Sequence, residues 1–406
     1  MNGKDEGYVE QKIQERLERI LYHAHTTTKF YSGFDVLKGI QSFPVINKNL
    51  IRENTDAFLS SKYNESSRIP AITSGSTGTP FKTYQNKDKK NRNTADTLFF
   101  ASLAGYDLGT KLLYFKIWSD YNRKSSFLQS IQNIVPVDVL NLKENAPRVF
   151  ELLNKQKRPV SFLGYVSAFE TLCKELEKNS VLRPSLKVKS IITMSEGLNE
   201  YTQKKGEEFF RCPVLSRYSN IENGIIAQQT FANRQDFTIN RASYFVEIMA
   251  LDKDEVLPLG ESGRIIVTDF YNEAMPLIRY DTGDIGVMEQ RDIDGVKQLV
   301  LSRLEGRKLD QIYNTKGDLI SSYIVYKNMW NYTEIEQYQL IQKEKKEYVM
   351  KICIPDKFIR EEQLIREFMS YLGMDANFKI EYVNEIPLLS SGKRKKVINE
   401  MSIVTK

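Results

Sequence analysis

The chain has 406 residues, and its 58 Lys+Arg against 52 Asp+Glu give a formal net charge of +6. With 41% hydrophobic and 27% charged residues it matches an ordinary globular protein, which excludes a disordered or collagen-like chain, and the small charge excess argues against a nucleic-acid partner. No apolar run approaches the ~18 residues of a membrane helix, and the N-terminus has no apolar signal-peptide core, so we expect a cytoplasmic protein that does not insert into membranes.

The first three hundred residues predict an α/β architecture. Residues 8–25 place apolar side chains at helical spacing along one face. From residue 35 to 270, short apolar runs typical of buried strands alternate with longer helical stretches. The strand-like runs are Pro159–Leu163, Val188–Thr193 and Ile265–Thr268, and the helical stretches include Val166–Leu176 and Leu198–Phe210. Strands that alternate with helices predict a fold with substantial parallel sheet.

The region after residue 310 predicts a smaller α+β unit. Ile335–Ile341 and Tyr348–Ile354 are strand-like and are joined by a charged turn. A helix that ends before Gly373 follows, and then a third strand over residues 378–382. We place the boundary near Gly306, which predicts two domains, residues 1–306 and 307–406.

Cysteine and histidine, two common nucleophile and metal-ligand types, are scarce in this chain. The three cysteines, Cys173, Cys212 and Cys353, lie far apart, which argues against a disulfide framework or a cysteine zinc site. His23 and His25 are the only histidines. An enzyme with this composition would work through lysines, carboxylates, backbone amides or a metal.

The densest signal is the run Thr73–Pro80, which contains Thr73, Ser74, Gly75, Ser76, Thr77, Gly78 and Thr79 after a strand-like Pro70-Ala71-Ile72. Glycines let successive N–H groups converge on an anion, and hydroxyls add donors to phosphate oxygens. The spacing is not that of a G-x-x-x-x-G-K-[ST] P-loop. The run therefore predicts a different kind of phosphate-binding loop, and a solvated Ser/Gly linker is the alternative.

Four further segments follow in order along the chain. They are Tyr218-Ser219-Asn220-Ile221-Glu222, Arg279-Tyr280-Asp281-Thr282-Gly283-Asp284, Gly306-Arg307-Lys308-Leu309-Asp310 and Ser391-Gly392-Lys393. Together with the hydroxyl-rich loop they resemble the motifs of adenylate-forming enzymes, the superfamily of acyl-CoA synthetases, peptide-synthetase adenylation domains and luciferases. The resemblance is closest to the phenylacetate–CoA ligase branch, including short relatives from polysaccharide loci. That branch's opening helix and its L-P-x-[LIV]-x-K loop are similar to residues 17–48, which keep the lysine at Lys48.

The resemblance implies a large N-terminal domain with layered, partly parallel sheets and helices, which binds ATP and a carboxylic acid, and a small mobile C-terminal lid. It implies that residues 73–79 bind the phosphates of ATP, with Thr77 catalytic. The nucleotide-binding residues implied elsewhere are Ser195, Glu196, Gly197, Tyr218 (beside adenine), Ser219, Asn220, Asp284 (on the ribose), Arg307 and Lys393.

The resemblance also implies the groups that carry charge in the reaction. Glu222 would hold Mg²⁺, because a carboxylate beside a triphosphate needs a cation between them. Lys393 would bridge the attacking carboxylate and the α-phosphate, although Arg394 and the lysines after it are equally typical of a basic tail. Asp310 would be the hinge.

The implied activity is acyl-adenylate formation with release of pyrophosphate, followed by transfer of the acyl group to coenzyme A. An amine, a hydroxyl of a sugar in surface-polysaccharide assembly, or a carrier protein stays open as the acceptor, and so does adenylation of a phenolic hydroxyl. A homodimer stays open as the assembly. Ser219 and Ile221 stand where the family has Gly and Thr, which leaves a non-catalytic nucleotide-binding homologue as the alternative of another class.

Overall fold

The computed structural model describes residues 6–73, 81–118, 125–140, 142–179, 188–293, 295–307, 312–320, 325, 328–329, 331–332, 334–354, 358–387 and 396–401. These residues form two compact units. The first comprises the described residues up to Leu304 except Gly283–Ile285, and the second comprises Gly283–Ile285 and those from Glu305 onward. The functions predicted for residues 1–306 and 307–406 are not tested by this division.

The helices of the first unit begin with a long amphipathic one that confirms the prediction for residues 8–25. They are α1 (Glu6–Thr27), α2 (Lys48–Glu53), α3 (Thr55–Phe58), α4 (Lys87–Leu103), α5 (Ser126–Ile131), α6 (Leu142–Asn154), α7 (Val166–Lys178) and α8 (Glu200–Phe210), with short 3₁₀ turns η1 (Val36–Lys38), η2 (Ile40–Ser42) and η3 (Glu65–Ser67).

The strands of the first unit fall into a small hairpin and one large sheet. They are β1 (Ile69–Thr73), β2 (Phe81–Gln85), β3 (Lys111–Lys116), β4 (Ile134–Asp138), β5 (Val160–Tyr165), β6 (Val188–Met194), β7 (Val214–Asn220), β8 (Gly224–Gln228), β9 (Phe237–Ile239), β10 (Tyr244–Met249), β11 (Ser262–Asp269), β12 (Tyr280–Ile293) and β13 (Val296–Arg307).

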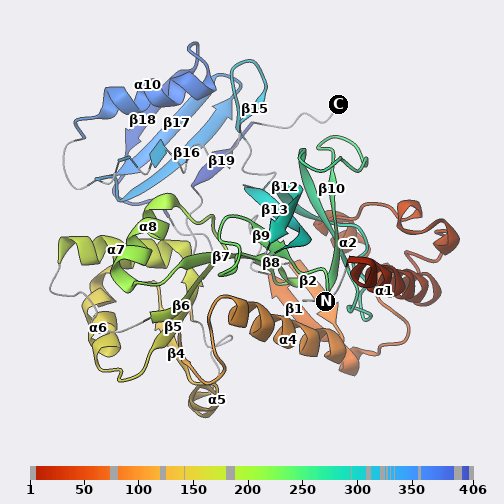
Figure 1. The fold of residues 1–406 in the computed structure, drawn as a ribbon. Helices are drawn as coiled ribbons and strands as arrows, with labels where there is room; N and C mark the ends of the chain where they lie inside the picture. The colour runs from red at the N-terminus through yellow and green to blue at the C-terminus, as the bar shows by residue number, and fades with distance from the viewer. Residues whose placement is uncertain are drawn as a thin grey trace. The chain divides into compact units, whose positions relative to one another are not determined.

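The large sheet is half parallel. Among the described residues its strand order is β10-β11-β12-β13-β9-β8-β7-β6-β5-β3-β4 (Figure 1). The five strands from β7 to β4 are parallel to their neighbours, whereas β8 and β9 continue the sheet in antiparallel pairing. Parallel neighbours need crossover connections, and α5 to α8 lie between these strands in the chain. The predicted α/β fold is confirmed.

The parallel half is covered on both faces by apolar contacts. Helices α6, α7 and α8 pack on one face through a core that includes Phe150, Phe169 and Phe210 (Figure 1). Ala101 of helix α4 and Ala104, which follows the helix, belong to a smaller cluster with strand residues of the same sheet. Because ligands of such sheets bind outside the carboxyl ends of the parallel strands, this layering directs attention to the ends of β3, β5, β6 and β7.

The strands β1 and β2 bracket the predicted phosphate loop. They pair in antiparallel fashion, and their register places Thr73 opposite Phe81. Residues 74–80 between them lie outside the described residues. The strand–loop–strand context nevertheless differs from the strand–loop–helix of a P-loop.

The second unit is an α+β sandwich of the predicted kind. Its elements are β14 (Ile312–Tyr313), β15 (Leu319–Ile320), β16 (Gln337–Glu344), β17 (Glu347–Cys353), α10 (Glu361–Leu372), β18 (Asn377–Tyr382) and β19 (Val397–Asn399). Four of its strands form a sheet in the order β18-β17-β16-β19. Helix α10 packs on this sheet (Figure 1) through Leu364 and Phe368 and ends at Gly373, whose φ of 119° suits glycine.

Among the described residues, no helix combines the length and the apolar character needed to cross a bilayer.

Candidate active site

A tight turn between β7 and β8 presents Glu222. The amide of Asn223 donates to Asn220 Oδ1 at 2.7 Å, which closes the turn. Two side chains from other elements hold its carbonyl groups. Gln85 Nε2, at the end of β2, donates to the Glu222 carbonyl at 3.0 Å, and the Tyr244 hydroxyl donates to the Asn223 carbonyl. Three separate elements therefore fix the position of the Glu222 backbone.

The Glu222 carboxylate is buried and asymmetrically bound. The residue is 1% exposed. Its Oε1 accepts a hydrogen bond from the Tyr280 hydroxyl at 2.7 Å and lies 2.7 Å from Lys48 Nζ. No described residue donates to Oε2. One oxygen is thus fixed by protein groups while the other is available, an arrangement that offers a hard ligand to a cation or an acceptor to a substrate.

The two partners of Glu222 arrive through one local pairing. Ile46 forms an isolated parallel bridge with Tyr280, in which the Ile46 amide donates to the Arg279 carbonyl at 3.0 Å and the Asp281 amide donates to the Ile46 carbonyl at 2.8 Å. Lys48 then starts α2, whose first amides donate to the Asn47 side chain. The pairing brings the loop before α2 and the start of β12 to the same carboxylate.

Lys48 also lies near the end of the predicted phosphate loop. Its Nζ is 5.4 Å from the centre of the Phe81 ring, and Phe81 is the first residue of β2. A third of the Lys48 side chain is exposed. A cation at this point is suited to bind anionic groups held by the predicted phosphate loop. The sequence placed Lys48 in a segment that resembles the family, but it did not predict this role.

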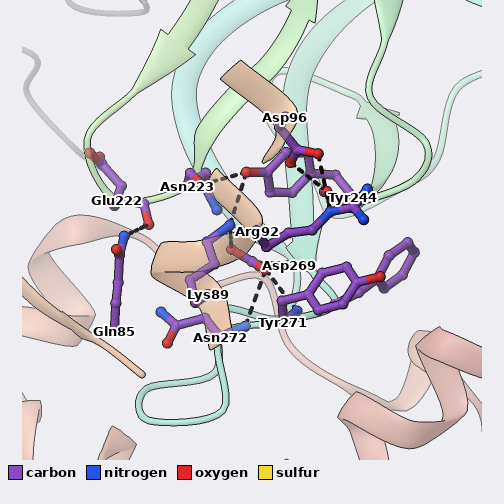
Figure 2. Close-up of polar contacts among 12 residues, drawn as sticks. Gln85, Lys89, Arg92, Asp96, Glu222, Asn223, Tyr244, Asp269, Tyr271 and Asn272 are labelled. Carbon is purple, nitrogen blue, oxygen red and sulfur yellow. Dashed lines mark hydrogen bonds and ion pairs between the residues drawn. The ribbon is translucent and has the colours of Figure 1, made fainter. Parts of the chain in front are cut away.

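A buried polar network supports the turn from beneath, as Figure 2 shows. Lys89 of α4 is fully buried, and its Nζ lies 2.6 Å from Asp269 Oδ2 and donates to the Tyr244 hydroxyl at 2.9 Å. Tyr244 in turn donates to the Asn223 carbonyl. Asp269 Oδ1 accepts the amides of Tyr271 and Asn272. The network links α4, β10 and the end of β11 to the turn that carries Glu222.

The structure brings the segment Tyr218–Glu222 next to the segment Arg279–Asp284. Tyr218, near the end of β7, donates its hydroxyl to Thr282 Oγ1 at 3.2 Å, and Thr282 donates to the Ile265 carbonyl at 2.9 Å. A bulge in the β7–β8 pairing falls between Tyr218 and Ser219, and Ser219 and Asn220 are half-buried beyond it. Tyr218 therefore has a fixed ring position at the carboxyl end of a parallel strand.

The Ser195–Gly197 segment follows β6 at the same edge of the sheet. Met194 at the end of β6 pairs with Arg217 of β7. Ser195 has a left-handed φ of 71°, which turns the chain. Glu196 accepts hydrogen bonds from the Ser167 amide at 2.7 Å and the Ser167 hydroxyl at 3.1 Å, so its carboxylate caps the first turn of α7. Its role toward a nucleotide stays a prediction.

Several predicted site residues are not placed against the others. Residues 74–79, Asp310 and Lys393 lie outside the described residues. The side chains of Thr73 and Arg307 are not described, although both residues end strands. Asp284 lies on β12 and is half-buried. The roles implied for these residues stay predictions.

A magnesium ion bound in part by substrate phosphates suits what the described residues offer. No group of three or more His, Cys, Asp or Glu side chains in this part of the chain is arranged to hold a metal ion. The protein's contribution would then be the free Oε2 of Glu222, because Mg²⁺ is commonly held by one or two carboxylates together with substrate phosphates and waters. The donor chemistry therefore fits the magnesium role that the sequence implied.

The chain is similar in sequence to two curated proteins and to one family model. Residues 312–400 match the family model "CapK C-terminal domain". Protein CapK of Staphylococcus aureus is 23% identical over 95% of this chain and 88% of its own length. The phenylacetate–coenzyme A ligase of Thermus thermophilus is 28% identical, but only over 33% of this chain and 31% of its own length.

Solved structures share the fold over nearly the whole chain. The 2-hydroxyisobutyryl-CoA ligase in the postadenylation state, in complex with R3-HIB-AMP, superposes with a TM-score of 0.76 at 16% identity, covering 96% of this chain and 89% of that protein. The same ligase in complex with 2-HIB-AMP and CoA superposes with a TM-score of 0.62. The chain therefore has the fold of the adenylate-forming ligases, and its C-terminal residues match the domain named for CapK.

Proposed function

We propose that this chain is an AMP-forming acid–CoA ligase of the cytoplasm. The observation that carries the proposal is the buried Glu222 carboxylate, with Oε1 fixed by Tyr280 and Lys48 and with Oε2 open. The turn that holds it shares strand β2 with the hydroxyl-rich loop, because Gln85 at the end of β2 donates to the Glu222 carbonyl. The arrangement supports a nucleotide site in which loop and carboxylate act on the same phosphates.

In the first half-reaction, a carboxylate oxygen of the acid would attack the α-phosphorus of ATP. The bond between the α-phosphorus and the bridging oxygen breaks, and pyrophosphate leaves. Residues 73–79 would hold the phosphates, Tyr218 would flank adenine and Asp284 would hold the ribose. The chemistry needs positioning and charge stabilisation rather than a histidine base, which agrees with a chain that has two histidines.

Two cations of the chain would act on the reacting anions. Lys48, 2.7 Å from Glu222, would lower repulsion among the phosphates, and Lys393 would bridge the acid's carboxylate and the α-phosphate. Glu222 Oε2 would hold Mg²⁺, which when bound offsets phosphate charge. Arg307 would contact the nucleotide, and the second unit would turn about Asp310 between the half-reactions.

In the second half-reaction, the thiol of coenzyme A would attack the acyl carbonyl, and the bond between that carbon and the AMP oxygen breaks. A structural neighbour described with an acyl-AMP and CoA supports this acceptor. The sequence match to the phenylacetate–CoA ligase covers only a third of the chain, whereas the match to CapK covers nearly all of it. An amine, a hydroxyl or a carrier protein is therefore kept as an acceptor that the test must distinguish.

The test is pyrophosphate release from ATP and Mg²⁺ over a panel of aryl, fatty, hydroxy and dicarboxylic acids, each with and without coenzyme A. Acid-dependent release that coenzyme A accelerates is the expected result. Acid-dependent release of pyrophosphate that coenzyme A does not accelerate would indicate that another molecule accepts the acyl group. ATP binding without release for any acid would favour the non-catalytic alternative, with Ile221 as a physical reason, since its exposed side chain has no hydroxyl to donate.

A further inference from the structure

Arg217 is a buried cation that is neutralised by no carboxylate in the part of the chain that the structure describes. It precedes Tyr218 on β7 and is 7% exposed. The two other buried arginines of the described residues both have acidic partners: Arg279 lies 3.0 Å from Glu247, and Arg264 lies 3.1 Å from Asp281. Arg217 has no ion pair with any described residue. Burying an unpaired charge is costly, and a bound anionic ligand would remove that cost.

The guanidinium is held in place by one of its three nitrogens. Arg217 Nε donates to Gln228 Oε1 at 2.7 Å, and Gln228 Nε2 donates to the Phe100 carbonyl of α4 at 2.7 Å. The two terminal nitrogens have no acceptor among the described residues. They are also not among the fully enclosed polar atoms that lack a partner, so they keep some accessible surface. The fork of Arg217 is thus oriented and still available.

The surroundings of Arg217 form an apolar wall at the carboxyl ends of the parallel strands. Alternation along β7 puts Arg217 on the same face as Leu215. On that face, Leu215 packs in one cluster with Leu163 and Ile192, against which Tyr114 and Met194 also pack. Met194, the last residue of β6, is the register partner of Arg217. An apolar wall that carries one oriented cation is the form of a small-molecule site with a single polar anchor.

Arg217 stays charged at neutral pH despite its burial. Burial lowers the pKa of its guanidinium to about 10, and the nearby Tyr114 phenol acts in the opposite direction. The cation is therefore present at the pH at which carboxylic acids are ionised.

We propose that Arg217 is a specificity-determining residue that binds a second carboxylate on the acid substrate, so that the chain activates dicarboxylic acids in preference to monocarboxylic acids. The inference rests on the proposed function and names its substrate class. A guanidinium fork pairs with a carboxylate through two parallel hydrogen bonds. An acid without the second carboxylate would leave the buried cation unpaired, which is the kind of mismatch that gives strong discrimination.

The test compares acids of equal chain length that differ only in the second carboxylate. Malonate, succinate, glutarate and adipate are set against propionate, butyrate, valerate and caproate in the pyrophosphate-release assay. The wild-type chain is expected to prefer the best diacid by at least about tenfold in kcat/KM. Arg217→Met should lose that preference through a loss on diacids alone. No preference in the wild-type chain, or an equal loss on both classes in Arg217→Met, would overturn the inference.

Two more variants separate recognition from folding. Arg217→Lys keeps the charge but not the fork, so it should retain a normal melting temperature and a reduced diacid preference. Arg148→Met removes an exposed arginine from α6 and should leave the preference unchanged. A diacid preference that is equally lost in Arg148→Met would show that the effect is not local to Arg217 and would count against the inference.

Binding measured by calorimetry without ATP makes the two proposals separable. Diacid binding to the wild-type chain that Arg217→Met abolishes, with no pyrophosphate release, would uphold the inference about Arg217 and overturn the proposed activity. Pyrophosphate release with monoacids, with diacids neither binding nor reacting, would uphold the activity and overturn the inference. Absence of both binding and release would overturn both.

Discussion

Glu222 is a buried carboxylate whose two oxygens have different surroundings. Oε1 is shared between the Tyr280 hydroxyl and the Lys48 ammonium, whereas Oε2 has no donor among the described residues. Burying a carboxylate is costly unless it is paired and hydrogen-bonded, and Lys48 and Tyr280 provide these two contacts. Oε2 is the atom that we propose binds Mg²⁺.

The first prediction at this scale concerns Glu222→Gln. The amide keeps the size and can still accept from Tyr280, but it removes the charge that would hold Mg²⁺. We expect the rate of pyrophosphate release to fall about 10²-fold or more and the Mg²⁺ concentration for half-maximal rate to rise. Steady-state rates across a Mg²⁺ titration measure both. The exposed Glu261→Gln is the control, and an unchanged Mg²⁺ requirement in Glu222→Gln would show that Glu222 does not hold the metal.

The second prediction concerns the pair of Lys48 and Glu222. Lys48→Met removes the cation beside a buried carboxylate and should lower the free energy of unfolding by about 1–3 kcal/mol, less than for a fully buried pair because Lys48 is a third exposed. The double variant Lys48→Met/Glu222→Gln should recover part of that loss, since no buried anion is then left unpaired. Urea unfolding of the four proteins measures the coupling. Additive losses would contradict a direct pairing.

Sequence reasoning could find Glu222 but not the residues around it. The order of the segments along the chain pointed to Glu222, Tyr218 and the hydroxyl-rich loop. The pairing of Lys48 with Glu222 depends on contacts between residues far apart in the chain, and no local pattern reports such contacts. Arg217 was missed for the same reason: the sequence shows an arginine next to an aromatic residue, and only the fold shows that it is buried with no carboxylate partner among the described residues.

At the scale of elements, the turn after β7 is held by its neighbours rather than by its own sequence. Helix α4 supplies Lys89, which lies between Asp269 and Tyr244, and Tyr244 reaches the Asn223 carbonyl (Figure 2). Burial lowers the pKa of the Lys89 ammonium, and the charge of Asp269 opposes that shift. The buried ion pair of Lys89 and Asp269 therefore also helps to fix the turn that carries Glu222.

The third prediction follows from this network. Lys89→Met leaves the Asp269 carboxylate buried without its cation, so we expect the free energy of unfolding to fall by about 3–5 kcal/mol. Lys90→Met, an exposed neighbour on the same helix, should change it by less than about 0.5 kcal/mol. Chemical denaturation followed by circular dichroism makes the comparison. Equal effects of the two substitutions would contradict the buried pair.

Elements with strong periodicity could be predicted from the sequence, and elements that depend on partners could not. The apolar spacing over Val166–Leu176 and over the residues before Gly373 predicted α7 and α10, and the charged turn after residue 342 predicted the β16–β17 hairpin; all three are confirmed. The continuation of the parallel strands into an antiparallel half was not predicted. Short strands such as β9 have little pattern of their own, and their pairing is decided by the neighbouring strand.

At the scale of the whole molecule, the chain divides into two compact units, each with its own core. The proposed mechanism needs the smaller unit to supply Lys393 to one half-reaction and to turn about Asp310 for the other. Closure of a small domain over a reactive intermediate keeps water from it. If the smaller unit acts in this way, a substitution in it should change the rates of the two half-reactions to different extents.

The fourth prediction tests that division. Lys393→Ala should nearly abolish acyl-adenylate formation while ATP binding, and thioester formation from a supplied acyl-adenylate, remain close to normal. Arg394→Ala is the matched control, because a merely basic tail would be weakened equally by either change. Single-turnover assays of the two half-reactions separate these outcomes. A normal adenylation rate in Lys393→Ala would show that Lys393 is not the bridging cation.

Isotope labelling of the acid tests adenylation by following one oxygen atom. The acid that gives the most pyrophosphate is prepared with ¹⁸O in its carboxylate, the reaction is run with coenzyme A, and the AMP is analysed by mass spectrometry. If the carboxylate attacks the α-phosphorus, its oxygen stays on phosphorus when the thiol displaces AMP, so we expect AMP that carries one ¹⁸O atom. Unlabelled AMP, or ADP with the label in inorganic phosphate, would contradict adenylation by this chain.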